Sequence, residues 1–169
     1  MHKTDIATLI AYTFWADNKI LSACERLSVA DFTRPATPDP GWHSLRGTLV
    51  HLLDTEYGWR AALQKLPDSG VFDEVDFPDV ASLKARWQEE QAAWFSCVAS
   101  LDDAALNEVW RADDKIQRTR WQTILHVIND GTYHRSEAAA MLTGYGQSPG
   151  ELDFEGYLVW TEHQARGAD

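Results

Sequence analysis

The segment HVINDGTYHR, residues 126–135, carries three side chains that could bind a metal ion. His126, Asp130 and His134 follow one another at steps of four, so they share one face of any helix that contains them. Imidazole nitrogens and carboxylate oxygens are common ligands of divalent transition metals. Residues four apart are separated by about 6 Å along a helix axis, and two such side chains can converge on one ion. Residues eight apart are separated by about 12 Å, which metal bonds of about 2 Å cannot bridge.

This spacing leaves two ligand pairs open: His126 with Asp130, or Asp130 with His134. Either pair supplies two ligands, whereas a catalytic metal usually takes three and keeps a position for water or substrate. His51 is the best third ligand, because it lies among apolar residues in LVHLLDTEYGW and follows Gly47 by one turn. Spacing alone favours simpler roles: an exposed ion pair for the aspartate with a histidine, and a core position for His51.

Four long segments with helical periodicity are expected to position these residues. They cover approximately residues 4–27, 45–66, 79–101 and 122–143. Thr4 or Asp5 can cap the first helix and Ser44 the second, because short polar side chains accept hydrogen bonds from the free N–H groups of a first turn. Prolines and glycines in segments 33–44 and 144–150 are expected to end the helices that precede them.

Two smaller elements complete the expected fold. In EVWRADDKIQRTRW, residues 108–121, two short runs flank Ala112, Asp113 and Asp114, a pattern compatible with a β-hairpin. FEGYLVWTEHQ, residues 154–164, predicts a short C-terminal helix. The sequence therefore predicts an all-α fold: a four-helix bundle in a single domain of 169 residues, with a short β-hairpin between the third and fourth long helices.

Composition limits the partners that the protein can take. The chain has a formal net charge of −11, with 44% hydrophobic and 24% charged residues. These proportions are ordinary for a globular domain. The acidic balance argues against nucleic acids and anionic membranes, because both attract basic surfaces. No apolar stretch approaches a membrane-spanning length and the first residues do not resemble a secretory signal, so we expect a cytoplasmic protein.

The cysteines and tryptophans have simpler expected roles. Cys24 and Cys97 lack CxxC spacing and are expected to be small buried residues rather than a disulfide or a zinc knuckle. Some tryptophans fit helical apolar faces and are expected in the core: Trp15, Trp59, Trp87 and Trp94. Others occur near segment ends, where they could line the mouth of an apolar pocket: Trp42, Trp110, Trp121 and Trp160.

The chain resembles the DinB/YfiT-like family, whose members are inferred to be metalloenzymes. The resemblance rests on LVHLLDTEYGWR in the second helix and WQTILHVINDGTYHRSEAAAMLTGYG in the fourth. It implies a four-helix bundle, often dimeric, in which His51, Asp130 and His134 bind a divalent metal. At Asp130 many relatives have histidine, and a carboxylate there is compatible with zinc or nickel, the leading candidates, and with manganese or iron. We therefore expect a homodimer with one metal site per chain.

Two further residues are candidates for orienting the metal ligands from outside the coordination sphere. His126 lies one turn before the proposed pair, and it is either such a partner or a core histidine. Glu56 falls on the apolar stripe of the second helix, and it is either an acceptor for a ligand or a buried hydrogen-bonded residue.

The resemblance also implies a class of reaction. A bound divalent ion would lower the pKa of a water or a low-molecular-weight thiol, such as bacillithiol, mycothiol or glutathione, for attack on a small electrophile. The expected activity is therefore thiol S-transfer or hydrolysis. The alternative is a non-catalytic, stress-associated helical dimer whose metal is structural or absent.

Overall fold

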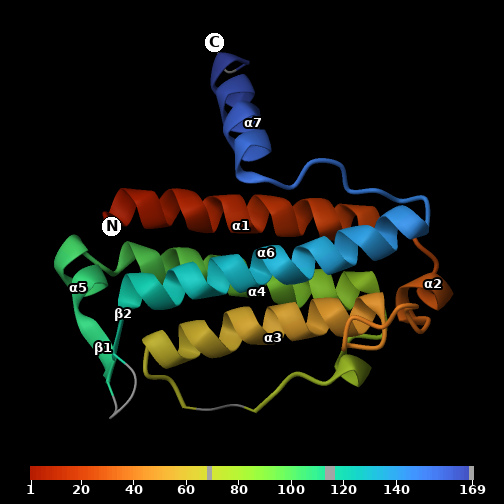
Figure 1. Ribbon diagram of the computed structural model, residues 1–169, viewed down its shortest axis with the longest axis horizontal. Helices are drawn as coiled ribbons and strands as arrows, with labels where there is room; N and C mark the ends of the chain where they lie inside the picture. The colour runs from red at the N-terminus through yellow and green to blue at the C-terminus, as the bar shows by residue number, and fades with distance from the viewer. Residues whose placement is uncertain (68–69, 113–116, 168–169) are drawn as a thin grey trace.

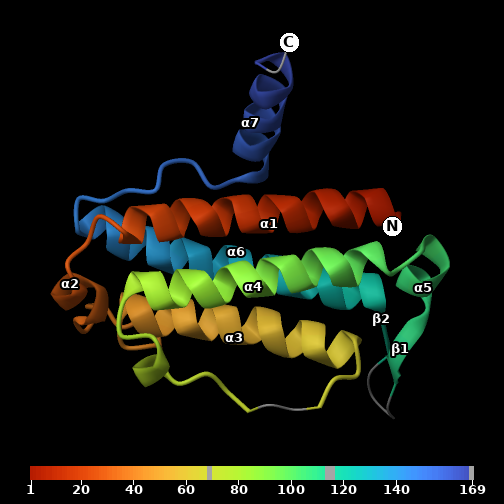
Figure 2. The ribbon, with the colours of Figure 1, turned by 180° about the vertical axis from the view of Figure 1, so that it is seen from behind.

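The computed structural model describes residues 1–67, 70–112 and 117–167, and four long helices dominate it (Figure 1). The long helices are α1 (Lys3–Cys24), α3 (Leu45–Leu63), α4 (Val80–Ala99) and α6 (Arg120–Gly144). The shorter elements are α2 (Val29–Thr33), the 3-10 helix η1 (Glu74–Asp76), α5 (Asp103–Asn107), β1 (Val109–Ala112), β2 (Gln117–Thr119) and α7 (Phe154–Arg166). α1 and α3 each pack against both α4 and α6, as the view from behind also shows (Figure 2). The predicted all-α four-helix bundle is confirmed.

Capping side chains set the starts of the first two long helices. The Ser44 hydroxyl oxygen accepts the N–H of Gly47 at 2.9 Å, which confirms the predicted cap of α3. The predicted cap of α1 is wrong, because the helix already begins at Lys3. Asp5 acts from within the first turn, where its carboxylate accepts the N–H of His2 at 2.8 Å.

The predicted β-hairpin is confirmed in its described part, where β1 pairs antiparallel with β2. Two residues of the predicted turn, Asp113 and Asp114, lie outside the described residues. Thr119 ends β2 and also caps α6, because its hydroxyl oxygen accepts the N–H of Gln122 at 3.4 Å. The strand therefore leads directly into α6, which begins at Arg120, earlier than predicted.

Apolar side chains from all four long helices fill the centre of the bundle. The predicted core tryptophans Trp87 and Trp94 are each 1% exposed, and burying a large apolar side chain contributes on the order of 1.5–3 kcal/mol. Cys24 and Cys97 are buried and unpaired, as expected. Trp15 is only half-buried, because it packs at the edge of the bundle against α7.

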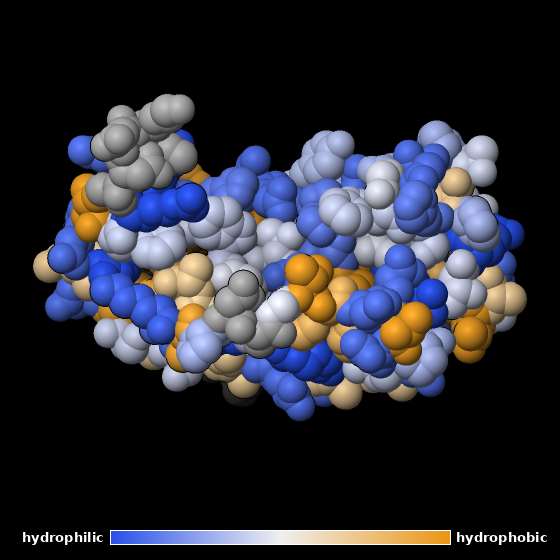
Figure 3. Space-filling model, turned by 90° about the horizontal axis from the view of Figure 1, so that it is seen from below, coloured by the Kyte–Doolittle hydropathy of each residue, from blue (hydrophilic) through white to orange (hydrophobic). Residues whose placement is uncertain are grey.

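The predicted C-terminal helix is confirmed as α7, which stands away from the bundle (Figures 1 and 2). Tyr157 anchors it to α1, with ring centroids 6.0 Å from Tyr12 and 5.7 Å from Trp15. Across the described ranges, none of the helices is both long and apolar enough to span a membrane. The face seen from below is mostly hydrophilic, with separate apolar patches (Figure 3).

Candidate metal centre

Two of the predicted ligands face each other across the contact between α3 and α6. His51 lies near the middle of α3, and His134 lies in the second half of α6. Their ring centroids are 4.7 Å apart, and the ring planes are nearly perpendicular at 83°. His134 is buried and His51 is half-buried. Direct packing of the two helices thus joins residues that are far apart in the sequence.

The third predicted ligand, Asp130, lies one turn before His134 on α6. Its Oδ1 atom is 3.7 Å from His134 Nε2, which is too long for a hydrogen bond. Two donors in a tetrahedral site with metal bonds of 2.0–2.1 Å are separated by about 3.4 Å. The observed separation is close to that value. The structure therefore brings His51, Asp130 and His134 to one place.

The donor types in this cluster fit a divalent ion, because two imidazoles and one carboxylate suit zinc, nickel, manganese and iron. Among residues 1–67, 70–112 and 117–167, however, no three His, Cys, Asp or Glu side chains are already arranged around a common point suited to an ion. Side-chain rotation is therefore needed to close this candidate set on a metal.

Trp42 covers His51 from the loop before α3. The two rings are stacked, with centroids 3.5 Å apart and an angle of 12° between their planes. Trp42 also lies 6.2 Å from the ring of His134. Gly47 allows this approach, because a Cβ at that position would be 2.0 Å from the Trp42 carbonyl oxygen. The space beside Gly47 is thus filled by the Trp42 backbone.

Glu137 contacts His134 from the side opposite Asp130, and sequence analysis missed it. Its Oε2 atom is 2.8 Å from His134 Nδ1. Carboxylates commonly bind metal-ligating histidines in this way, which fixes the tautomer and leaves Nε2 for the metal. The only signal in the sequence was that Glu137 follows His134 by three residues, and therefore lies on the same helical face.

Comparisons with known proteins establish the family of the chain. The model of the DinB family matches residues 1–167. The chain belongs to the DinB family. No curated protein sequence matches this DinB protein. Its fold is similar to the crystal structure of the conserved protein of locus from Enterococcus faecalis, with a TM-score of 0.64 and 17% identity over 84% of this chain and 96% of that chain. At this identity the likeness concerns the fold alone.

The two residues predicted to orient the ligands of this DinB protein have other surroundings. His126 is exposed, two turns before His134, and its ring packs edge-on against Trp59 at 5.2 Å. Glu56 is 1% exposed and accepts the indole N–H of Trp87 at 2.8 Å. Its contacts match the second role that the sequence left open, a buried hydrogen-bonded residue.

Electrostatic effects around the three candidate ligands favour the neutral imidazole form of His51. Burial lowers the pKa of His51, and the facing ring of His134 lowers it further. The carboxylates of Asp130, Asp54 and Glu137 act in the opposite direction, but their effect is smaller. Neutral imidazole is the form that binds metals, so His51 is poised as a ligand.

A pocket of about 680 Å³ lies beside the cluster and includes Glu137 in its wall. The proline-rich loop 34–40 forms one side, and the last turns of α6, with Met141, form the other together with Tyr145, which follows the helix. Pockets of about 300–1,000 Å³ are typical of small-molecule sites. The DinB protein therefore has space for a small organic molecule next to the carboxylate that holds His134.

Proposed function

We propose that His51, Asp130 and His134 hold a divalent metal ion, and that the protein is a metal-dependent enzyme acting on a small electrophilic substrate. The observation that supports this proposal is the proximity of His134 to the other two side chains, with its ring centroid 4.7 Å from that of His51 and its Nε2 atom 3.7 Å from the Asp130 oxygen. Zinc or nickel suits this donor set best, and manganese or iron is compatible with it. A bound ion would supply Lewis acidity toward a water molecule or a low-molecular-weight thiol.

The residues around the cluster have separate tasks in this proposal. Glu137 holds His134 at Nδ1 and so keeps Nε2 directed toward the centre. Trp42 shields one face of His51 from water. The neighbouring pocket offers an apolar wall, including Met141, for the body of a substrate. The reaction class is thiol S-transfer or hydrolysis.

An alternative is a non-catalytic metal-binding protein, and the stacking of Trp42 on His51 favours it. A ring centroid 3.5 Å above the imidazole covers one approach to the centre. If the indole stays in place when metal binds, access for a substrate is reduced. This alternative predicts bound metal without any metal-dependent reaction of thiols or water.

The test is a screen of low-molecular-weight thiols and water against small electrophiles. It compares metal-loaded protein, chelated protein and His134→Ala, with His126→Ala as the matched control, because His126 is an exposed histidine of the same helix. We expect turnover in the loaded wild type and in His126→Ala, and a loss of at least 100-fold on chelation and in His134→Ala. Full turnover by metal-free protein would contradict the proposal, and bound metal without turnover would favour the alternative.

A further inference from the structure

A second set of charged side chains is buried at the centre of the bundle. Asp17 of α1, Glu56 of α3 and Arg135 of α6 are 0%, 1% and 2% exposed. Arg135 Nη1 donates to Asp17 Oδ1 at 3.0 Å. From α4, Trp87 donates its indole N–H to Glu56 Oε2 at 2.8 Å. This buried cluster, Asp17, Glu56, Arg135 and Trp87, takes one residue from each long helix.

The buried cluster is adjacent to the candidate metal ligands in sequence. Arg135 directly follows His134, and Glu56 follows His51 by about a turn and a half of helix. Gly131 makes room for the arginine, because a Cβ there would be 2.9 Å from Arg135 Nη1. The hydrogen bonds of the cluster join α6 to α1 and α4 to α3, so α3 and α6 are linked through Asp17 of α1, close to the point where the two histidines face each other.

The hydrogen bonding of the two carboxyl groups is incomplete unless they share a proton. Asp17 Oδ2 and Glu56 Oε1 are buried and have no N–H or O–H donor in the described part of the chain. Two buried carboxylates beside one guanidinium would leave an uncompensated negative charge, which is costly in a protein core. A single proton removes the excess charge and supplies the missing donor.

Glu56 is the group that carries this proton. Burial raises the pKa of Asp17, but its ion pair with Arg135 opposes this rise and favours the charged form. Burial and the neighbouring Asp17 carboxylate raise the pKa of Glu56 well above its ordinary value. Asp17 is a close charged neighbour of Glu56 and its Oδ2 atom lacks a donor, which a protonated Glu56 would supply.

Other charged or titratable groups are close to the buried cluster. Tyr12 of α1 lies under the Arg135 guanidinium, with 5.8 Å between the guanidinium carbon and the ring centroid. One turn after Glu56 on α3, Arg60 binds Glu90 of α4, and Arg86 of α4 donates to Glu90 at 3.3 Å. Arg60 and Arg86 already donate hydrogen bonds to Glu90. They therefore do not supply the donor that Asp17 and Glu56 lack.

We infer that Asp17, Glu56 and Arg135 are positioning residues for the candidate metal centre, and that a proton shared by the two carboxyl groups keeps them in place. The inference rests on the proposed function for the identity of the centre. When the proton is present, the hydrogen bonds of the buried cluster keep α3 and α6 at a fixed separation beside His51 and His134. Without the proton donor, one carboxylate oxygen is left buried and unpaired, and the helices adjust to hydrate it.

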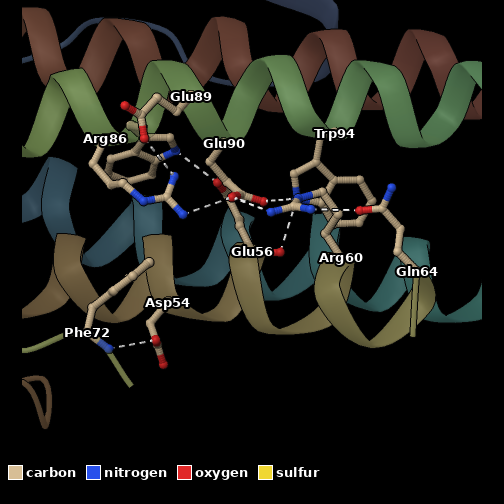
Figure 4. A network of polar contacts seen from close by, with 10 residues as sticks. Asp54, Glu56, Arg60, Gln64, Phe72, Arg86, Glu89, Glu90 and Trp94 are labelled. Carbon is tan, nitrogen blue, oxygen red and sulfur yellow. Dashed lines mark hydrogen bonds and ion pairs between the residues drawn. The ribbon is translucent and has the colours of Figure 1, made fainter. Parts of the chain in front are cut away.

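The Arg60–Glu90 ion pair offers a matched control (Figure 4). It is also buried, with Arg60 6% and Glu90 0% exposed. It joins α3 to α4 and does not include α6. Removing it should lower the stability of the bundle without changing the distance between His51 and His134.

The experiment measures zinc affinity by competition with a chromophoric chelator for wild type, Glu56→Leu, Glu56→Gln and Glu90→Leu. We expect Glu56→Leu to weaken zinc binding at least tenfold. Glu56→Gln should bind within twofold of wild type, because its amide can donate to Asp17 and accept from Trp87. Glu90→Leu should also stay within twofold. If Glu56→Leu does not fold, Gly131→Ala replaces it, because the added methyl displaces Arg135 while favouring helix.

A metal-free readout separates failure of this inference from failure of the proposed function. Nuclear Overhauser contacts between the rings of His51 and His134 report their approach without any metal. They should persist in Glu56→Gln and Glu90→Leu and weaken in Glu56→Leu. If wild type binds none of zinc, nickel, manganese or ferrous iron but this pattern holds, the proposed function fails and the positioning role stands. The positioning role is wrong if Glu56→Leu keeps the contacts, or if Glu56→Leu and Glu90→Leu weaken zinc binding equally.

Discussion

At the residue scale, His134 is the best-defined side chain of the candidate centre. Glu137 contacts one ring nitrogen at 2.8 Å, and Asp130 lies 3.7 Å from the other. These contacts come from the same helix, at positions three after and four before the histidine. The orientation of His134 is therefore set locally by α6, whereas His51 depends on how α3 packs against it.

Replacing Glu137 should weaken metal binding, although the residue is not one of the proposed ligands. A carboxylate behind a metal-binding histidine typically contributes 10–100-fold to affinity. We expect zinc affinity to fall by about that factor in Glu137→Ala and by less in Glu137→Gln, whose amide oxygen can still accept from Nδ1. Isothermal titration with zinc measures both. Ser136→Ala, an exposed neighbour, should bind as wild type does, and equal affinities in all three variants would exclude the orienting role.

The sequence could not rank the histidines on its own. Steps of four relate His126 to Asp130 in the same way as Asp130 to His134. The resemblance to the DinB-like family selected the second pair with His51, and the contact between α3 and α6 brings these three together. Glu137 was missed because an exposed ion pair and a ligand-orienting contact have the same helical spacing.

At the element scale, local chemistry predicted the boundaries of the long helices to within three residues, and the errors have both local and distant causes. Ser44 was predicted correctly because an N-cap acts within one turn. α1 begins earlier than predicted partly because Asp103 of α5 accepts the N–H of Lys3 at 2.7 Å. α3 ends before its predicted limit, and Lys65 follows with a φ of 55°, which no helical pattern reveals.

Two glycines of α3 should respond oppositely to alanine. A Cβ at Gly47 would be 2.0 Å from a backbone oxygen of Trp42, so the loop must move. Gly47→Ala should destabilise the protein by about 1–3 kcal/mol despite the better helix propensity of alanine. Gly58 has nothing within 4 Å of its Cβ position, so Gly58→Ala should stabilise the protein by about 0.4–1 kcal/mol. Urea unfolding measures both, and stabilisation by Gly47→Ala would contradict the close approach of Trp42.

The buried cluster predicts how stability depends on pH. The pKa of Glu56 is raised in the folded protein, so its protonated state is favoured by folding. The resulting stability is fully present below the ordinary pKa of glutamate and is lost as pH rises through the raised value. Glu56→Gln cannot lose a proton, so the decline in stability from pH 5 to pH 8 should shrink in this variant.

The midpoints of urea unfolding at pH 5 and at pH 8 measure this decline in stability. Glu151→Gln is the control, because Glu151 is exposed. The control should keep the decline seen in wild type. An equal decline in wild type and Glu56→Gln would mean that Glu56 is already ionised in the fold.

At the scale of the whole molecule, the sequence predicted the bundle but not the placement of its last helix. Helical periodicity and helix lengths were enough for the four long helices. The position of α7 depends on aromatic contacts of Tyr157 with Tyr12 and Trp15, which lie far away in the sequence. The formal net charge of −11 is the basis for expecting a small-molecule partner rather than a nucleic acid, and Figure 3, which shows a mostly hydrophilic lower face, does not test this expectation.

The family resemblance leads us to predict a homodimer. Light scattering coupled to size-exclusion chromatography should therefore give twice the chain mass of 19.1 kDa. The mass should stay the same over a tenfold dilution in the micromolar range if the dimer is stable. A mass of one chain at all these concentrations would exclude the homodimer.

The most direct test of the central claim is the metal content of protein purified without an affinity tag, measured by elemental mass spectrometry. Wild type should carry close to one divalent ion per chain, natively or after reconstitution with zinc, nickel, manganese or ferrous iron. Folded His51→Ala and His134→Ala should carry almost none, whereas His126→Ala should keep it. A wild type that stays metal-free with every ion, or variants that retain full metal content, would show that His51, Asp130 and His134 do not form a metal centre.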